Sequence, residues 1–379
     1  MAKESDSPLT DQQMLNTFLK SNKDHFQFME ARYWRISTGS LLLDSTIGYV
    51  TPGVHRFVGQ NSGGKTSEAL EVMRNFLASV KPSKGVFFNA EHRLGDELKE
   101  RCGLKFVTKP EDWVTGTVFV FDTNCYETVA EFIQKLILNA SSENYYGIII
   151  DSIDALGLKN DLAKGFDEAS KVAGGAVIAS LLLKRIAAPL TKRGHFLIPI
   201  SQVRSDIKLD QYAPKEIRQI SGTGGNALLH YANLILDFQP RFKGDLIVTK
   251  EGEAPSSSNP LLGHWAKIIV RKSSNETLNY LIKYPIKYGV KGGSSIWVVR
   301  ELVDSLVQWE EVEKRGSWYS FSGDIQQVLN KGGVTDIPAS IQGMDGIFAW
   351  LDSNPIAVKA LFDHFKQVNA GGLSVSEIT

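Results

Sequence analysis

Residues 59–66, Gly-Gln-Asn-Ser-Gly-Gly-Lys-Thr, match the phosphate-loop pattern G-x-x-x-x-G-K-[ST]. Residues 55–58 before the loop are typical of a short strand, and apolar residues after it recur at helical spacing. A chance glycine-rich turn does not account for these flanks, which are the ones the motif requires. The feature therefore constrains the chain to an α/β fold in which backbone N–H groups and a helix N-terminus point at phosphate oxygens. We predict a nucleotide site formed by Gly59, Gln60, Asn61, Ser62, Gly63, Gly64, Lys65, Thr66 and Ser67.

Lys65 and Thr66 end the loop, and both carry groups that phosphates and metal ions need. A lysine at this position reaches the β- and γ-phosphates, and the hydroxyl coordinates Mg²⁺. A second acidic group must then help to hold the metal. Asp151 follows the apolar run 148–150, which is the form of a Walker B strand. Such a run is common by itself, but beside a phosphate loop it assigns Thr66 and Asp151 to a metal site.

Two further polar side chains follow predicted strands. Glu91 comes shortly after the apolar run 86–88, and Gln202 comes after the run 196–200. Ligands of open α/β sheets bind at the carboxyl ends of the strands. Glu91 is therefore a candidate base for water and Gln202 a candidate γ-phosphate sensor. The plainer interpretation of Glu91 is an acid at a helix N-terminus. We predict Lys65, Glu91 and Gln202 as the catalytic residues.

The rest of the core alternates apolar strands with helical segments. Short apolar runs of this kind are typical of central parallel strands that are buried on both faces, with helices between them. Two later segments, 265–270 and 280–288, alternate as added antiparallel strands do. We expect strands at 55–58, 86–88, 118–121, 147–150, 196–198 and 234–236, and a C-terminal helix near 356–365.

Composition excludes several classes of protein. Lys and Arg number 42, as do Asp and Glu, so no global basic field indicates nucleic acid and any polyanion site must be a local patch. The 2 cysteines are too few for a disulfide framework. The polar N-terminus lacks the core of a signal peptide, and the longest apolar run, 173–183, is too short to span a membrane. We expect a soluble, intracellular protein with no membrane partner.

The segment 203–225 is the best candidate for contact with nucleic acid. It is long for a loop inside a compact core, and such loops are usually functional or disordered. Basic side chains and exposed glycine amides can both contact phosphates. The segment 159–171 mixes both charge signs, and on charge alone a solvated face explains either segment. The candidate DNA-binding residues are Lys164, Lys171, Arg204, Lys208, Lys215, Arg218, Gly222, Thr223, Gly224, Gly225 and Asn226.

Four segments besides the phosphate loop resemble the RecA family of homologous recombinases. Residues 36–44 resemble the segment that precedes the family's core, and Ala90-Glu91-His92 resembles its catalytic-glutamate strand. Residues 223–232 resemble the end of its second DNA-binding loop, and residues 301–319 resemble the start of its C-terminal domain. The resemblance spans residues 36 to 365 in consistent order, and this order is far more specific than a phosphate loop alone.

The resemblance implies a DNA-dependent ATPase that uses ATP and Mg²⁺. It implies a helical filament on single-stranded DNA that pairs it with homologous double-stranded DNA. Single-strand-binding and loader proteins are candidate partners, and the location is the cytoplasm of a bacterium or of a phage-infected host. The family's pattern makes Glu91 the base, Gln202 the sensor, and segments 159–171 and 203–225 the DNA-contacting loops. It also implies that an adjacent protomer supplies cations to the nucleotide, for which Arg271 and Lys272 are the nearest matches.

The resemblance also implies how the chain divides. The fold expected is a RecA-type P-loop NTPase core, a mainly parallel twisted sheet with helices on both faces. The divisions are an N-terminal helical oligomerisation arm at 1–35, the ATPase core at 36–293, a small α+β C-terminal domain at 294–368 and a disordered tail at 369–379. The residues alone leave open whether the first helix packs on its own domain or docks on a neighbouring subunit.

Some positions depart from the family's pattern, and two other functions remain open. Leu98 stands where the family usually has an aromatic residue that stacks on adenine, and Gly95 stands where an acidic contact is common. His230 stands where phenylalanine usually lies at the filament interface. The alternatives are a hexameric helicase-type motor on the same fold and a non-catalytic, ATP-binding recombinase paralogue. Intact Glu91 and Asp151 argue against the paralogue.

Overall fold

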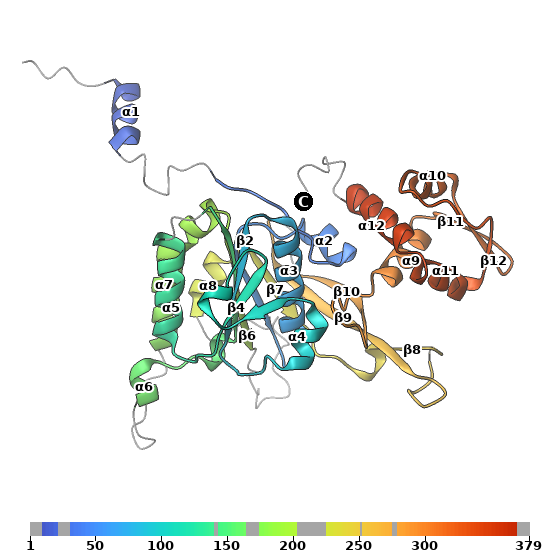
Figure 1. Cartoon of the computed structure of the whole chain (residues 1–379), viewed down its shortest axis with the longest axis horizontal. Helices are drawn as coiled ribbons and strands as arrows, with labels where there is room; N and C mark the ends of the chain where they lie inside the picture. The colour runs from blue at the N-terminus through green and yellow to red at the C-terminus, as the bar shows by residue number, and fades with distance from the viewer. Residues whose placement is uncertain are drawn as a thin grey trace, which may run out of the picture.

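One large twisted sheet forms the centre of the molecule (Figure 1). This computed structural model describes residues 10–21, 31–139, 143–163, 174–202, 225–250, 252–274 and 279–369. Ten described strands make the sheet, in the order β10-β9-β7-β1-β6-β5-β2-β4-β3, with β8 paired to β9. The strands β1 to β7 pair in parallel, and β8, β9 and β10 add antiparallel pairs. The expected α/β fold with a mainly parallel sheet is confirmed.

The strands lie where apolar runs predict them, with somewhat longer bounds. Runs buried on both faces form the central strands, because a parallel sheet covered by helices exposes neither face. All eight expected strands are present. The bounds are β1 Gly53–Gly59, β2 Ser83–Asn89, β3 Lys105–Val107, β4 Thr117–Phe121, β5 Tyr145–Asp151, β6 Phe196–Gln202, β7 Leu234–Phe238, β8 Leu246–Val248, β9 Leu261–Lys272 and β10 Tyr280–Lys287.

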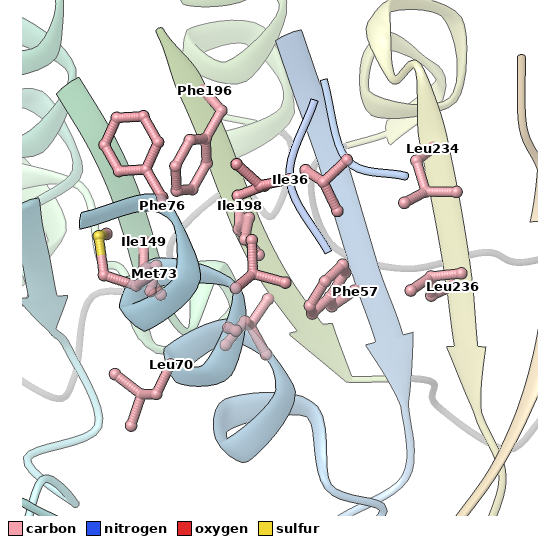
Figure 2. Packing of buried hydrophobic residues seen from close by; sticks show 14 of the residues in the cluster. Ile36, Phe57, Leu70, Met73, Phe76, Ile149, Phe196, Ile198, Leu234 and Leu236 are labelled. Atoms are coloured by element: carbon pink, nitrogen blue, oxygen red, sulfur yellow. The ribbon is translucent and has the colours of Figure 1, made fainter. Parts of the chain in front are cut away.

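Helix α3 (Lys65–Ser79) covers the middle of one face of the sheet. Its apolar side chains Leu70, Met73 and Phe76 are fully buried against strand residues such as Phe196 and Phe57 (Figure 2). Phe76 meets Phe196 edge to face with ring centroids 4.9 Å apart, a favourable aromatic geometry. This packing fixes the helix that follows the phosphate loop. Two short helices accompany it, α2 (Leu41–Ile47) and α4 (Asp96–Cys102).

The opposite face is covered by α5 (Tyr126–Asn139), α7 (Gly174–Lys192) and α8 (Gly225–Tyr231). Buried residues of α5 and α7, including Ile133 and Ile186, pack against the strand residues Ile148 and Leu197. Helices thus lie on both faces, which buries the parallel strands completely. Shorter elements in the connections are the helix α6 (Lys159–Ala163) and the 3₁₀ turns η2 (Pro110–Asp112), η3 (Ile153–Ala155) and η4 (Lys243–Asp245).

The C-terminal part has a core of its own, built from residues between Val299 and Phe365 with Leu41 of α2. Glu301 anchors it to the core, accepting hydrogen bonds from Ser40 Oγ at 2.5 Å and Leu41 N at 2.9 Å. Burial raises the pKa of Glu301 to about 8, although these two hydrogen bonds act to lower it. The expected C-terminal helix is present as α12. The elements are α9 (Val298–Gln308), β11 (Val312–Arg315), β12 (Trp318–Phe321), α10 (Gly323–Lys331), β13 (Ile341–Gln342), α11 (Gly343–Asp352) and α12 (Pro355–Asn369).

The first helix, α1 (Asp11–Ser21), stands apart from the rest of the molecule (Figure 1). A capping box begins the helix: Thr10 N donates to Gln13 Oε1 and Gln13 N donates to Thr10 Oγ1. Its apolar stripe is exposed, with Met14 and Leu15 each 57% accessible. The helix does not pack on the described part of its own chain. Within the described ranges, no helix is both long and apolar enough to cross a bilayer.

Candidate nucleotide-binding site

Four neighbouring strands bring their carboxyl ends to one edge of the sheet. The order β1-β6-β5-β2 places the phosphate loop, Gln202, Asp151 and Glu91 side by side. The register pairs Gly59 with Gln202 and Asn89 with Asp151, so β1 ends level with β6 and β2 ends level with β5, while β6 extends two residues beyond β5. Residues that are far apart in sequence therefore meet at the edge where such sheets bind ligands.

The phosphate loop lies between β1 and α3, as its motif predicts. Gly59 has φ +150°, and a Cβ there would lie 2.2 Å from the carbonyl oxygen of Phe238, so only glycine is tolerated. Lys65 Nζ donates to the carbonyls of Gly59 at 3.0 Å and Gln60 at 2.7 Å. Burial lowers the pKa of Lys65, and the carboxylates Asp151, Glu91 and Asp154 oppose this shift. The loop holds a partly buried cation at its base.

Thr66 and Asp151, the predicted metal-site residues, are in direct contact. Thr66 Oγ1 donates to Asp151 Oδ2 at 2.8 Å. Burial raises the pKa of Asp151, while the Thr66 hydrogen bond and the charge of Lys65 lower it. A hydroxyl and a carboxylate are the hard oxygen ligands that Mg²⁺ prefers beside phosphates. The donor set therefore fits the metal that the motif implies.

Glu91 is held by three donors. Its Oε1 accepts hydrogen bonds from the Ser152 hydroxyl and from Gln202 Nε2, the latter at 3.0 Å. Its Oε2 pairs with Arg93 Nη1 at 2.9 Å. Gln202 is fixed in turn by its backbone N, which donates to Asp154 Oδ2 at 2.7 Å. The predicted base and the predicted sensor thus touch each other.

A cavity of about 620 Å³ joins these groups. On one side lie the phosphate loop, Glu91, Asp151 and Gln202. On the other lie side chains of α4 and β10, where Leu98 offers an apolar surface and Tyr284 donates to Glu68 Oε2 at 2.8 Å. The cavity has room for a nucleoside next to a phosphate site. Its wall further includes Arg93, Arg101, Arg241, His264, Lys287 and Tyr288.

Arg271 and Lys272 do not line the cavity of the described chain. Arg271 pairs with Asp237, its Nη2 lying 2.7 Å from Oδ2. Lys272 Nζ donates to the carbonyls of Leu229 and His230 at the end of α8. Both cations lie at the end of β9, whereas the β9 residues that line the cavity, His264 and Ala266, lie nearer its start. Both cations also have partners within their own chain.

Most of the predicted DNA-binding residues lie outside the described residues. These are Lys164, Lys171, Arg204, Lys208, Lys215, Arg218, Gly222, Thr223 and Gly224. Gly225 begins helix α8, which also contains Asn226. What the structure does place is the point where segment 203–224 begins, directly after Gln202 at the end of β6.

Sequence reasoning missed the three residues that bond to Glu91 or to the backbone of Gln202: Arg93, Ser152 and Asp154. Arg93 follows Glu91 by two positions and Ser152 directly follows Asp151, so proximity to a predicted residue was the available signal. Asp154 has no such signal. Its contact with Gln202 spans 48 positions and depends on the neighbouring strands β5 and β6.

The fold and the site define a P-loop NTPase with a mainly parallel sheet and a Walker B carboxylate. A family model described as the RecA N-terminal domain matches residues 25–254, more than half of the chain. The chain belongs to the RecA family. The RecA protein of Prochlorococcus marinus (strain NATL1A) is 26% identical over 345 residues, 90% of this chain and 78% of that protein. The RecA protein of Acinetobacter baylyi is 28% identical over 348 residues, 90% of this chain and 83% of that protein.

Proposed function

We propose that this protein is a DNA-dependent ATPase that forms filaments on single-stranded DNA and catalyses homologous pairing and strand exchange. At the family level, RecA proteins are recombinases and DNA-dependent ATPases that bind ATP with Mg²⁺. The observation that carries the proposal is the contact between Glu91 and Gln202, 3.0 Å apart in the cavity of the phosphate loop. It joins a candidate base to a candidate sensor that directly precedes segment 203–225.

The proposed reaction is hydrolysis of the γ-phosphate. Lys65 and the loop amides bind the phosphates, and Thr66 and Asp151 hold Mg²⁺, which neutralises charge on the phosphate oxygens when it is bound. The oxygen of a water molecule bonds to the γ-phosphorus as the bond to the β–γ bridging oxygen breaks. Glu91 accepts a proton from that water. Its partly buried position near Lys65 keeps the carboxylate close to the phosphates.

We infer that the same site controls DNA binding through Gln202. In the structure, the Gln202 side chain donates to Glu91 and its backbone donates to Asp154. A γ-phosphate oxygen is a stronger, charged acceptor for the same amide. Moving the side chain to it would bias the segment 203–225, which starts at the next residue, toward one conformation. ATP would then raise affinity for DNA, and hydrolysis would lower it.

Self-association completes the proposal. The exposed apolar stripe of α1 supports an arm that docks on a neighbouring subunit, since it covers nothing in its own described chain. Arg271 and Lys272 are proposed as cations that an adjacent protomer brings to the nucleotide. Each would have to leave a partner in its own chain, Asp237 for Arg271 and the end of α8 for Lys272.

The deciding experiment is the rate of phosphate release from ATP with and without single-stranded DNA, with electron microscopy of the same samples. We expect stimulation by DNA, and helical filaments that require ATP. Strand exchange between a circular single strand and a homologous linear duplex should follow. Unwinding of a forked duplex without exchange would instead indicate the helicase-type motor, and nucleotide binding without DNA-stimulated turnover would indicate the non-catalytic paralogue.

DNA contacts of this kind would be mainly to phosphates. Affinity should therefore fall steeply with salt, by roughly 10³-fold or more between 50 and 200 mM when several phosphates are contacted, with little dependence on sequence. Fluorescence anisotropy with labelled oligonucleotides of different composition measures both properties. A shallow salt dependence with strong sequence preference would contradict the proposed mode of binding.

A further inference from the structure

The carboxylate of Glu91 has few acceptor positions left for a water molecule. A carboxylate offers about four lone-pair sites, and three donors already occupy Glu91. Ser152 and Gln202 share Oε1, and Arg93 takes Oε2. A general base must be within hydrogen-bond reach of the proton that it abstracts. One lone-pair site therefore remains, on the Oε2 that Arg93 contacts, and departure of Arg93 would open this oxygen fully to a water molecule.

Arg93 is the donor best placed to move. Its backbone N is held by Asn89 Oδ1 at 3.0 Å, so the start of the side chain is fixed. The side chain of Arg93 is 67% exposed to solvent, compared with 13% for the side chain of Glu91. An ion pair with one exposed partner is weak, because water competes for the guanidinium. A change of side-chain rotamer can break it without disturbing the backbone.

The guanidinium of Arg93 also lies in the region where phosphates would bind. Arg93 lines the same cavity as the phosphate loop. Burial is the main influence on the pKa of Lys65 and of Asp151, but the charge of Arg93 acts on both groups as well. Arginine binds phosphate through two parallel hydrogen bonds, and the planar fork makes this contact geometrically specific. A γ-phosphate is thus a better acceptor for Arg93 than the single contact it makes with Glu91.

We propose that Arg93 is a γ-phosphate ligand supplied by the same chain, and that its transfer from Glu91 to the γ-phosphate frees Oε2 of Glu91 for the attacking water. The proposal rests on the function proposed above, because it assigns Glu91 as the base. ADP has no γ-phosphate, so Arg93 stays on Glu91 when ADP is bound. The residue therefore distinguishes ATP from ADP and exposes the base only when the substrate is present.

The test compares affinities for two nucleotides in the full-length protein. Isothermal titration with Mg²⁺ and either ADP or the non-hydrolysable analogue AMP-PNP is carried out without DNA, at concentrations where light scattering gives a monomer. Arg93→Ala should weaken AMP-PNP binding by about 10-fold or more, as expected for loss of hydrogen bonds between charged groups. The affinity for ADP should change by less than about 2-fold, since ADP lacks the group concerned. Arg93→Lys should be intermediate, because lysine keeps the charge and loses the fork.

The chain contains a matched control. Arg315 and Glu313 in β11 form the same kind of pair, two residues apart, with Nη2 and Oε2 separated by 3.3 Å. The arginine is likewise exposed, and the pair lies in the C-terminal part, away from the cavity. Arg315→Ala should leave both affinities unchanged. Circular dichroism of each variant checks that the fold is intact.

Equal weakening of both nucleotides by Arg93→Ala, or no change for either, would overturn the proposal. A rise in turnover with unchanged affinities would also overturn it, because Arg93 would then only restrain Glu91. A different result would refute the function proposed above. A wild-type protein that binds AMP-PNP but never hydrolyses ATP refutes the hydrolase, while the ratio of affinities still decides the role of Arg93. A wild-type protein that binds neither nucleotide refutes both.

Discussion

Replacing Glu91 by glutamine removes the proposed base and changes little else. One oxygen of the new amide can still accept from Ser152 and Gln202, as Oε1 does now. The lost ion pair with Arg93 is exposed on the arginine side, so the free energy of unfolding should fall by less than about 1 kcal/mol. A positioned general base contributes about 10²- to 10⁴-fold to a rate, or roughly 3–5 kcal/mol of barrier. Glu91→Gln should lower kcat by that factor.

The assay is steady-state phosphate release at saturating ATP and single-stranded DNA, with nucleotide and DNA affinities measured on the same preparation. Both affinities should stay within about 3-fold of wild type, because the variant keeps the groups that bind phosphate. Glu313→Gln, which breaks the exposed pair with Arg315, controls for the loss of a carboxylate. Turnover by Glu91→Gln within a few-fold of wild type would refute the assignment of the base. A parallel loss of nucleotide binding would mean that Glu91 acts in binding and not in chemistry.

Two further predictions concern Lys65 and Glu301. Lys65→Ala removes the buried cation that bonds to Gly59 and Gln60. The affinity for ATP should fall by about 10- to 100-fold, and the affinity for DNA should no longer respond to ATP. An unchanged affinity for ATP would exclude this lysine from the site. Glu301 has its pKa raised from 4.5 to about 8 by burial, so the folded state keeps a proton that the unfolded state releases between these pH values. This stabilisation is complete below pH 4.5 and is lost as pH rises through about 8, and it amounts to at most roughly 5 kcal/mol. In Glu301→Gln, the free energy of unfolding measured with urea should fall less between pH 5 and pH 8 than it does in the wild type. An equal fall in both proteins would contradict the raised pKa assigned to Glu301.

Much of the fold was predictable because its signals are local. The buried runs at 86–88 and 147–150 indicate strands, and the apolar spacing after Lys65 indicates a helix, since each pattern depends on residues a few positions apart. The capping box of Thr10 and Gln13 is local in the same way, and both of its hydrogen bonds are present. The order of the strands has no local signal, because it depends on pairings between distant segments.

The C-terminal part illustrates the limit. Its last helix was predicted near 356–365, but Leu41 belongs to its core and Glu301 bonds to Ser40, more than 250 positions earlier. Neither contact appears in the pattern of the residues concerned. A buried carboxylate needs partners, and only the folded chain supplies the ones that Glu301 uses.

The sequence by itself determined the phosphate-loop motif and predicted a nucleotide site there, since glycine spacing, Lys65 and Thr66 specify this motif whatever lies around it. It also indicated Asp151 and Glu91 as separate candidates at strand ends. Only the tertiary structure decided that they share one cavity, because β6 and β5 lie between β1 and β2 and all four strands run in parallel to the same edge of the sheet. The same packing set Gln202 on Glu91, a contact that arises when distant strand ends converge, whereas Arg93 reaches Glu91 from only two positions away.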